Sequence, residues 1–274
     1  MQALKNKIIL LLMFIFSFFP CFIHLDAKKP MFQKNFSTDA VMDIFHMEAE
    51  TNARLFLLGK NYMVHEDKLY EVTWNGQDLL IAWESPNFFE ERSPLLLSGG
   101  MLRGTNFELL VLTYTKLYLI NPESKEIVYE QAHKWKPEEV CVGDIDGDGL
   151  EEIIFSRIEK IGLKYNSESI MIYEWDGETF IYKQSSGGIG NIRAITTTDL
   201  DMDQVEEIIL EEGLEGKGGS VLVLARREDK LKVLCKQKIS SQPVWDMIFD
   251  AREKSRIYFI AGGFIKTMVW NGKS

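Results

Sequence analysis

The sequence has few of the residues on which disulfide-stapled or metal–sulfur scaffolds depend. It contains 3 cysteines and 4 histidines in 274 residues, and the cysteine count excludes a disulfide-stapled fold. His46, His65 and His133 lie far apart and have no cysteine neighbours, which argues against a zinc or copper site. Cys141 and Cys235 lie in apolar, strand-like runs, so we expect buried free thiols. With 46% apolar residues, the chain needs no staples to bury a large core.

Catalytic motifs and excess positive charge are also missing. There is no H-E-x-x-H motif, no G-x-S-x-G motif and no phosphate-binding loop. Residues 213–220 are glycine-rich, but their spacing is wrong for a phosphate-binding loop, and we expect a connector between strands. The formal net charge of −10 makes nucleic acids and anionic membrane surfaces poor partners. The sequence therefore favours a protein that is not an enzyme and does not bind nucleic acid.

Long helical periodicity is scarce as well, and short apolar runs separated by turn residues dominate the chain. This pattern predicts an all-β fold. Within residues 221–225 both sets of alternating side chains are apolar, as in sheets covered on both faces. Strong hairpin signals follow three tryptophans, at intervals of about two repeats: Asn75-Gly76, Asp176-Gly177 and Asn271-Gly272.

These signals divide the chain into five repeats, near residues 40–83, 95–131, 140–184, 192–239 and 244–274. In the first repeat we expect strands near residues 40–46, 54–59, 67–74 and 78–83. The fifth repeat ends after its third strand-like run. Either residues 31–36 supply the missing strand and close a ring, which removes exposed sheet edges, or the sequence is a piece of a longer protein. We favour ring closure.

One acidic segment, residues 140–155 (VCVGDIDGDGLEEIIF), carries the strongest functional signal. Its carboxylates alternate at Asp144, Asp146 and Asp148, and they repel one another unless a cation lies among them. Oxygen donors at this spacing suit Ca²⁺. An EF-hand is excluded because its bidentate glutamate would fall at Phe155, and strands rather than helices flank the loop. The alternatives are a calcium loop between two strands and a plain acidic hairpin turn.

The same pattern recurs in residues 195–210 (ITTTDLDMDQVEEIIL). The expected ligands of the first loop are four side chains and one backbone carbonyl: Asp144, Asp146, Asp148, Glu152 and the carbonyl of Leu150. Those of the second loop are Asp199, Asp201, Asp203, Glu207 and the carbonyl of Val205. Met202 and Gln204 replace the two glycines of the first loop, so we expect weaker binding at the second.

Two other repeats contain reduced versions of the loop. In the second repeat, residues 100–111 align so that Glu108 corresponds to Glu152, but the other acidic ligands are missing. In the fifth repeat, Asp250 begins a segment with Arg252 and Lys254 in ligand positions. We expect neither of these segments to bind a metal ion.

The pattern D-x-D-x-D-x-x-x-[DE] between β-strands resembles the FG-GAP and VCBS repeats of integrin-like β-propellers. The family usually has aspartate at the ninth position, where this chain has Glu152 and Glu207. The resemblance implies a β-propeller of about five four-stranded blades. It also implies calcium loops that join the first two strands of two blades.

The N-terminus has the form of a targeting segment. Lys5 and Lys7 precede the apolar residues 8–25, as in a signal peptide that comprises residues 1–27. The apolar run is also long enough to stay as an uncleaved membrane anchor. Both readings predict a secreted or otherwise extracytoplasmic protein, and the second adds membrane attachment through residues 8–25.

Together these patterns favour a non-catalytic, calcium-stabilised binding module for a protein or polysaccharide. The alternative is an enzyme on the same scaffold, such as a polysaccharide lyase or hydrolase, because fold alone does not decide function. Trp83, Trp135 and Trp245 lie near the repeat boundaries. They are either stacking platforms for a ligand or packing wedges between blades, and we favour packing.

Overall fold

The computed structural model describes residues 40–47, 54–61, 66–74, 79–85, 87, 96–161, 165–213, 219–227, 230–239, 244–249, 256–261 and 264–269. The predicted leader or anchor, the predicted strand at residues 31–36 and the degenerate loop that begins at Asp250 lie outside these residues. So do the turns Asn75-Gly76 and Asn271-Gly272. None of the described segments forms an apolar helix of membrane-spanning length.

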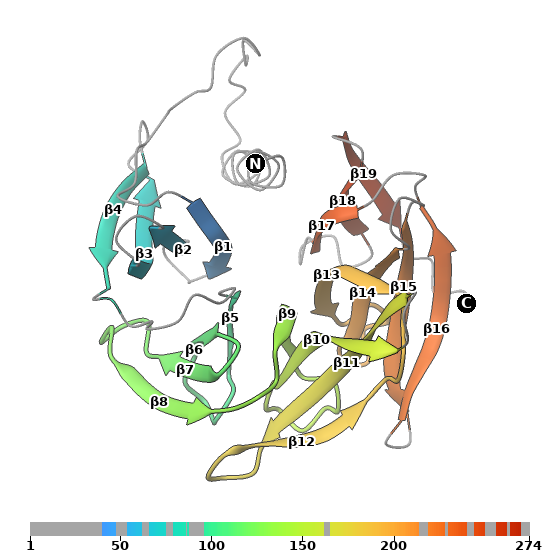
Figure 1. Cartoon of the computed structure of the whole chain (residues 1–274), viewed down its shortest axis with the longest axis horizontal. Helices are drawn as coiled ribbons and strands as arrows, with labels where there is room; N and C mark the ends of the chain where they lie inside the picture. The colour runs from blue at the N-terminus through green and yellow to red at the C-terminus, as the bar shows by residue number, and fades with distance from the viewer. Residues whose placement is uncertain are drawn as a thin grey trace. The chain divides into compact units, whose positions relative to one another are not determined.

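All elements in the described part of the chain are β-strands, which form five antiparallel sheets (Figure 1). This confirms the all-β prediction. In every sheet, strands that are consecutive in the sequence are neighbours, so each sheet is a simple meander. The chain divides into two compact units, Met1–Leu95 and Leu96–Ser274.

The first unit contains one sheet, with the strands β1 (Ala40–Met47), β2 (Arg54–Asn61), β3 (Glu66–Trp74) and β4 (Leu79–Glu84). These bounds agree with the expected strands to within two residues. Successive residues of β2, Phe56, Leu57 and Leu58, are all buried, so both faces of this strand are covered.

The second unit contains four sheets. Three have four strands: β5 (Leu96–Gly100), β6 (Glu108–Leu112), β7 (Lys116–Ile120) and β8 (Ile127–Ala132); β9 (Pro137–Gly143), β10 (Glu152–Ile161), β11 (Tyr165–Trp175) and β12 (Phe180–Ser185); β13 (Asn191–Thr198), β14 (Glu207–Gly213), β15 (Gly219–Arg227) and β16 (Lys230–Lys238). The last has three described strands: β17 (Val244–Phe249), β18 (Arg256–Ala261) and β19 (Phe264–Val269).

The core of the second unit lies between successive sheets. On β15, Leu222 and Leu224 belong to an apolar cluster shared with the β9–β12 sheet. Val221 and Val223, on the opposite face of the same strand, belong to a cluster shared with the last sheet. The prediction that both faces of residues 221–225 are covered is therefore confirmed. Sheets stacked face to face need apolar side chains at every position of a central strand, which explains the continuous apolar runs.

Trp135 packs in this core rather than on a surface. It is 8% exposed and belongs to the cluster between the β5–β8 and β9–β12 sheets, where it stacks on Phe155 with ring centroids 5.3 Å apart. Trp83 is half-buried, and the side chain of Trp245 lies outside the described residues. Of the two predicted buried thiols, Cys141 is buried and free, while Cys235 is free but half-exposed, so that part of the prediction was wrong.

Candidate metal-binding loops

Both acidic loops connect the first two strands of a sheet, as expected. Glu152, the first residue of β10, lies opposite Gly143, the last residue of β9. Glu207 lies opposite Thr198 in the same way. This register makes the ninth-position glutamate a strand residue, so the sheet fixes its backbone while the loop carries the aspartates.

Each of these glutamates is 2% exposed and turns back into its own loop. Glu152 Oε2 accepts the backbone N–H of Ile145 at 3.0 Å, and Glu207 Oε2 accepts that of Leu200 at 2.9 Å. Burial raises the pKa of Glu152 to about 8 and that of Glu207 to about 7, and the neighbouring aspartates add to the rise while the backbone hydrogen bond opposes it. A carboxylate in this position favours a proton or a metal cation as its partner.

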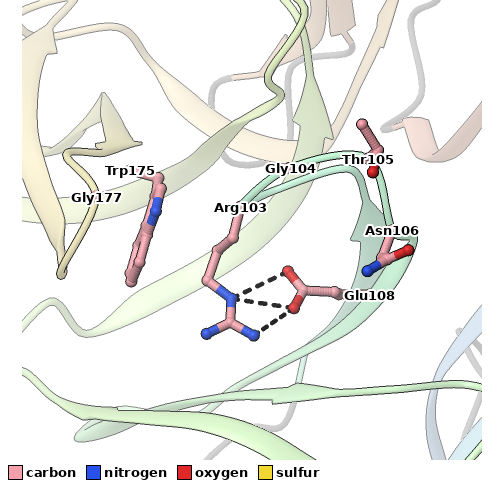
Figure 2. A pocket seen from close by; sticks show the side chains of 7 residues that line it. All are labelled: Arg103, Gly104, Thr105, Asn106, Glu108, Trp175 and Gly177. Atoms are coloured by element: carbon pink, nitrogen blue, oxygen red, sulfur yellow. Dashed lines mark hydrogen bonds and ion pairs between the residues drawn. The ribbon is translucent and has the colours of Figure 1, made fainter.

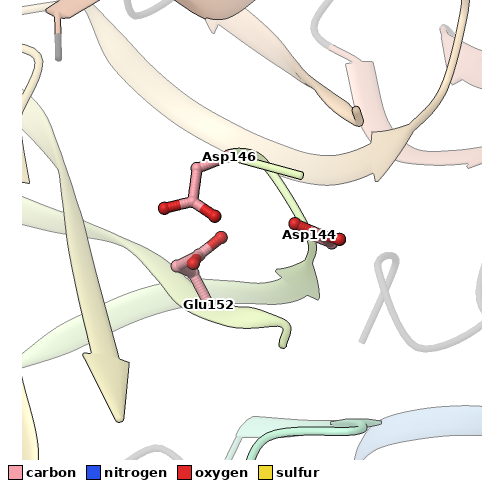
Figure 3. A group of neighbouring side chains, drawn as sticks. All are labelled: Asp144, Asp146 and Glu152. Atoms are coloured by element: carbon pink, nitrogen blue, oxygen red, sulfur yellow. The ribbon is translucent and has the colours of Figure 1, made fainter. Parts of the chain in front are cut away.

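In the first loop, three of the four predicted side chains converge. Carboxylate oxygens of Asp144, Asp146 and Glu152 lie within 4.8 Å of one another (Figure 3). Asp148 is not in this group, and its Oδ1 accepts the N–H of Leu150 at 2.8 Å. Asp144 is held by the N–H groups of two loop glycines, at 2.7 and 3.0 Å.

In the second loop, a different set converges. Carboxylate oxygens of Asp199, Asp201 and Asp203 lie within 4.8 Å of one another, and Glu207 is not in the group. Asp199 accepts the N–H groups of Asp203 and Gln204, both at 3.1 Å. The carbonyls of Leu150 and Val205 stay predicted ligands.

The backbones of the two loops have the same shape, although only one has glycines. Gly147 and Gly149 have φ of 79° and 89°, and Met202 and Gln204 have φ of 66° and 74°. This left-handed region costs a residue with a Cβ atom about 1–2 kcal/mol. The second loop therefore carries a conformational cost that the first avoids. This cost is the reason why we expect the second loop to bind calcium more weakly.

Two arginines at the end of β15 reach the loops, a contact that no local sequence pattern indicates. Arg226 Nη1 donates a hydrogen bond to Asp146 Oδ2 in the first loop. Arg227 lies 3.7 Å from Asp201 and 3.6 Å from Asp203 in the second. Adjacent residues of a strand point to opposite faces, so this one strand end supplies a positive charge to each loop.

The loops of neighbouring sheets are also linked to one another. The N–H of Glu206 donates to the carbonyl of Asp144 at 2.8 Å, and the Thr197 hydroxyl donates to the carbonyl of Val142 at 2.8 Å. A Cβ atom on Gly143 would lie 2.7 Å from the Cβ atom of Thr197, so any other residue there requires the neighbouring strand to shift. Burial raises the pKa of Glu206 to about 7. A change in one loop therefore acts on its neighbour through direct contacts.

The second repeat has the same register without the acidic cluster. Glu108 lies opposite Gly100, as Glu152 lies opposite Gly143, but the intervening loop 101–107 is one residue shorter. Arg103 is the partner of the buried Glu108 carboxylate: its Nε and Nη2 donate hydrogen bonds to Glu108 at 3.0 and 2.6 Å. The predicted correspondence between Glu108 and Glu152 is confirmed, and an arginine neutralises this glutamate.

Comparison with known proteins identifies the architecture alone. No protein-family model matches the sequence, and no curated protein is significantly similar to it. The crystal structure of the Cps50 (Swd1) β-propeller domain of Myceliophteria thermophila superposes with a TM-score of 0.51, at 7% identity, covering 84% of this chain and 83% of that one. The fold is a β-propeller. Sqt1 from Chaetomium thermophilum gives a TM-score of 0.47 at 11% identity, covering 84% of this chain and 69% of that one.

Proposed function

We propose that the protein is a calcium-stabilised, non-catalytic β-propeller that binds a protein or polysaccharide outside the cytoplasm. A ring of five blades and export through the N-terminal segment are parts of this proposal. The observation that carries it is the convergence of carboxylates at equivalent places in two blades. Export is tested by cell fractionation, and recovery of the native protein in the cytosol with residues 1–27 intact would contradict it.

The donor set of the first loop fits Ca²⁺. Ca²⁺ takes six to eight hard oxygen ligands, and the loop offers only oxygen donors. The converging atoms belong to Asp144, Asp146 and Glu152, and Asp148 and the Leu150 carbonyl lie in the same loop. Arg226 supplies one positive charge against the three aspartates, so the loop stays negatively charged without a metal ion even when Glu152 carries a proton.

The proposed role of the ion is to hold the loops, which are joined by a backbone hydrogen bond, from the N–H of Glu206 to the carbonyl of Asp144. Each loop joins two strands whose faces contribute to the clusters between sheets. Removing the cation restores the repulsion among the carboxylates and weakens this region first. The ligands are committed to the loop, so binding of a partner takes place elsewhere on the propeller.

Thermal melting with and without chelator tests the proposal. A site with a Kd of ~10⁻⁴ M in ~2 mM Ca²⁺ stabilises by roughly 1.8 kcal/mol, or about 4–7 °C in melting temperature. Asp146→Ala should abolish most of the calcium-dependent rise and Asp201→Ala a smaller part, because the second loop lacks the glycines.

The control variant is Glu178→Ala, which removes an exposed carboxylate outside both loops and should keep the full calcium effect. Asp146→Ala also removes the partner of Arg226, so each variant is compared with itself in chelator. If chelator leaves the melting temperature of the parent unchanged, both loops are ordinary acidic turns.

A further inference from the structure

A cavity of about 330 Å³ lies between two sheets of the second unit, apart from the two acidic loops (Figure 2). Its lining comes from the β5–β6 loop, the first residue of β6, the last residue of β11 and the β11–β12 turn: Arg103, Gly104, Thr105, Asn106, Glu108, Trp175 and Gly177. The volume is at the low end of the range of about 300–1,000 Å³ that is typical of small-ligand pockets. The cavity therefore suits one small ring rather than an extended chain.

The aromatic wall of the cavity is fixed by contacts outside it. Trp175 meets Tyr129 edge-on, with ring centroids 5.1 Å apart. The Gln131 side chain bonds both the N–H and the carbonyl of Phe180, at 2.9 and 3.0 Å. Asp176 Oδ1 accepts two N–H groups of the turn, at 2.9 and 2.8 Å. These contacts hold the end of β11 and the following turn in place, and a wall fixed in this way lowers the entropic cost of binding.

The two charged residues of the cavity lining, Arg103 and Glu108, carry opposite charges that nearly cancel. The Arg103 guanidinium lies 5.0 Å from the ring centroid of Tyr129 and 5.5 Å from that of Trp175. Its Nε and Nη2 donate to Glu108, and Nη1 makes no hydrogen bond within the described part of the chain. Because Glu108 offsets the charge of Arg103, a carboxylate or phosphate ligand would meet a negative neighbour. A neutral ligand with several hydroxyl groups avoids this cost.

We propose that the cavity binds a single ring of a neutral glycan. Because the Arg103 guanidinium lies over the indole of Trp175, the sugar contacts this indole beside the guanidinium, where an aromatic surface suits its apolar face. Its hydroxyls meet Nη1 of Arg103, the amide of Asn106 and the hydroxyl of Thr105. This deepens the proposed binding function by naming a ligand class, and it is independent of calcium.

The test uses the purified full chain and four neutral probes: methyl glucoside, methyl galactoside, methyl mannoside and N-acetylglucosamine. Glucuronate and inorganic phosphate are the anionic probes. Saturation-transfer NMR and calorimetric titration should give saturable binding of at least one neutral sugar, with a Kd on the order of 1 mM, as is typical of one small ring. Binding only of glucuronate or phosphate, or of none of the probes, overturns the proposal.

Variants locate the binding. Asn106→Ala and Thr105→Ala change exposed loop side chains and should each weaken binding by about tenfold, while Trp175→Leu should abolish it. The matched control is Tyr182→Ala, which removes an aromatic residue that is 52% exposed and lies outside the cavity. Equal affinity in the parent and in both loop variants would overturn the site.

The outcome is separable from that of the calcium proposal. Calcium-dependent melting without sugar binding refutes the cavity proposal alone. Sugar binding that persists in chelator, together with calcium-independent melting, refutes the calcium proposal alone.

Discussion

Replacing Arg226 by glutamine should increase the calcium affinity of the first loop. Arg226 Nη1 bonds Asp146 Oδ2, and their side chains are 9% and 18% exposed. Asp146 also belongs to the converging carboxylates. A calcium ion must therefore share this carboxylate with the guanidinium or displace it. Glutamine keeps much of the side-chain volume but removes the positive charge that competes for Asp146.

The size of the effect follows from what the arginine contributes. A hydrogen bond between charged groups in a partly buried setting is worth about 1.5–3 kcal/mol. If calcium binding gives up that bond in the parent, the variant should bind calcium about tenfold or more tightly. Without calcium the variant should unfold more easily, by a similar free energy, because Asp146 loses its partner.

The assay is calorimetric calcium titration in an Asp201→Ala background, so that only the first loop responds. Arg227→Gln is the control: this arginine is 40% exposed and lies near the second loop, so the first loop should bind calcium almost as before. Weaker calcium binding by Arg226→Gln than by the parent would refute the reasoning. It would mean that Arg226 holds the loop in the shape that the ion needs.

Three further predictions concern stability. Met202→Gly should stabilise the chain by about 0.5–1 kcal/mol in chemical denaturation, because φ at this position is 66°; no gain would contradict the assigned strain. Arg103→Met should cost about 3–5 kcal/mol by leaving Glu108 buried and unpaired. Adding Glu108→Gln to Arg103→Met should restore part of the lost stability, because it removes the unpaired charge. If stability is not restored, the loss comes from the packing of the Arg103 side chain. In chelator, stability should fall as pH rises from about 4.5 to about 8, because folded Glu152 keeps a proton that the unfolded chain releases, with a slope of at most about 1.4 kcal/mol per pH unit. Glu152→Gln should flatten this slope, and an equal slope in that variant would assign it to other groups.

Local patterns were enough to predict the strands and the position of the acidic loops. Strand bounds in the first repeat agree to within two residues because hairpin signals and alternating side chains are properties of adjacent residues. The correspondence of Glu108 with Glu152 held because the register of a hairpin is set by the strands that flank it. The left-handed residues Met202 and Gln204 were also foreseeable, since the loop sequence is otherwise parallel to one with glycines.

Which side chains meet was decided by the tertiary structure. The sequence predicted four carboxylate ligands in each loop without distinguishing among them. In the structure, Asp148 accepts a backbone N–H and lies outside the first cluster, and Glu207 lies outside the second. Trp135 was open to two interpretations until its neighbours across the sheet interface were known.

Contacts between distant segments had no sequence signal. Arg226 reaches a carboxylate 80 residues earlier in the chain, and Trp175 shares a cavity with Arg103 from another sheet. The physical reason is that a strand pattern specifies which face a residue occupies, whereas the partner on that face depends on how neighbouring sheets stack. The sequence by itself determined the strands and loops, and the stacking of the sheets decided the charge balance of the loops and the walls of the cavity.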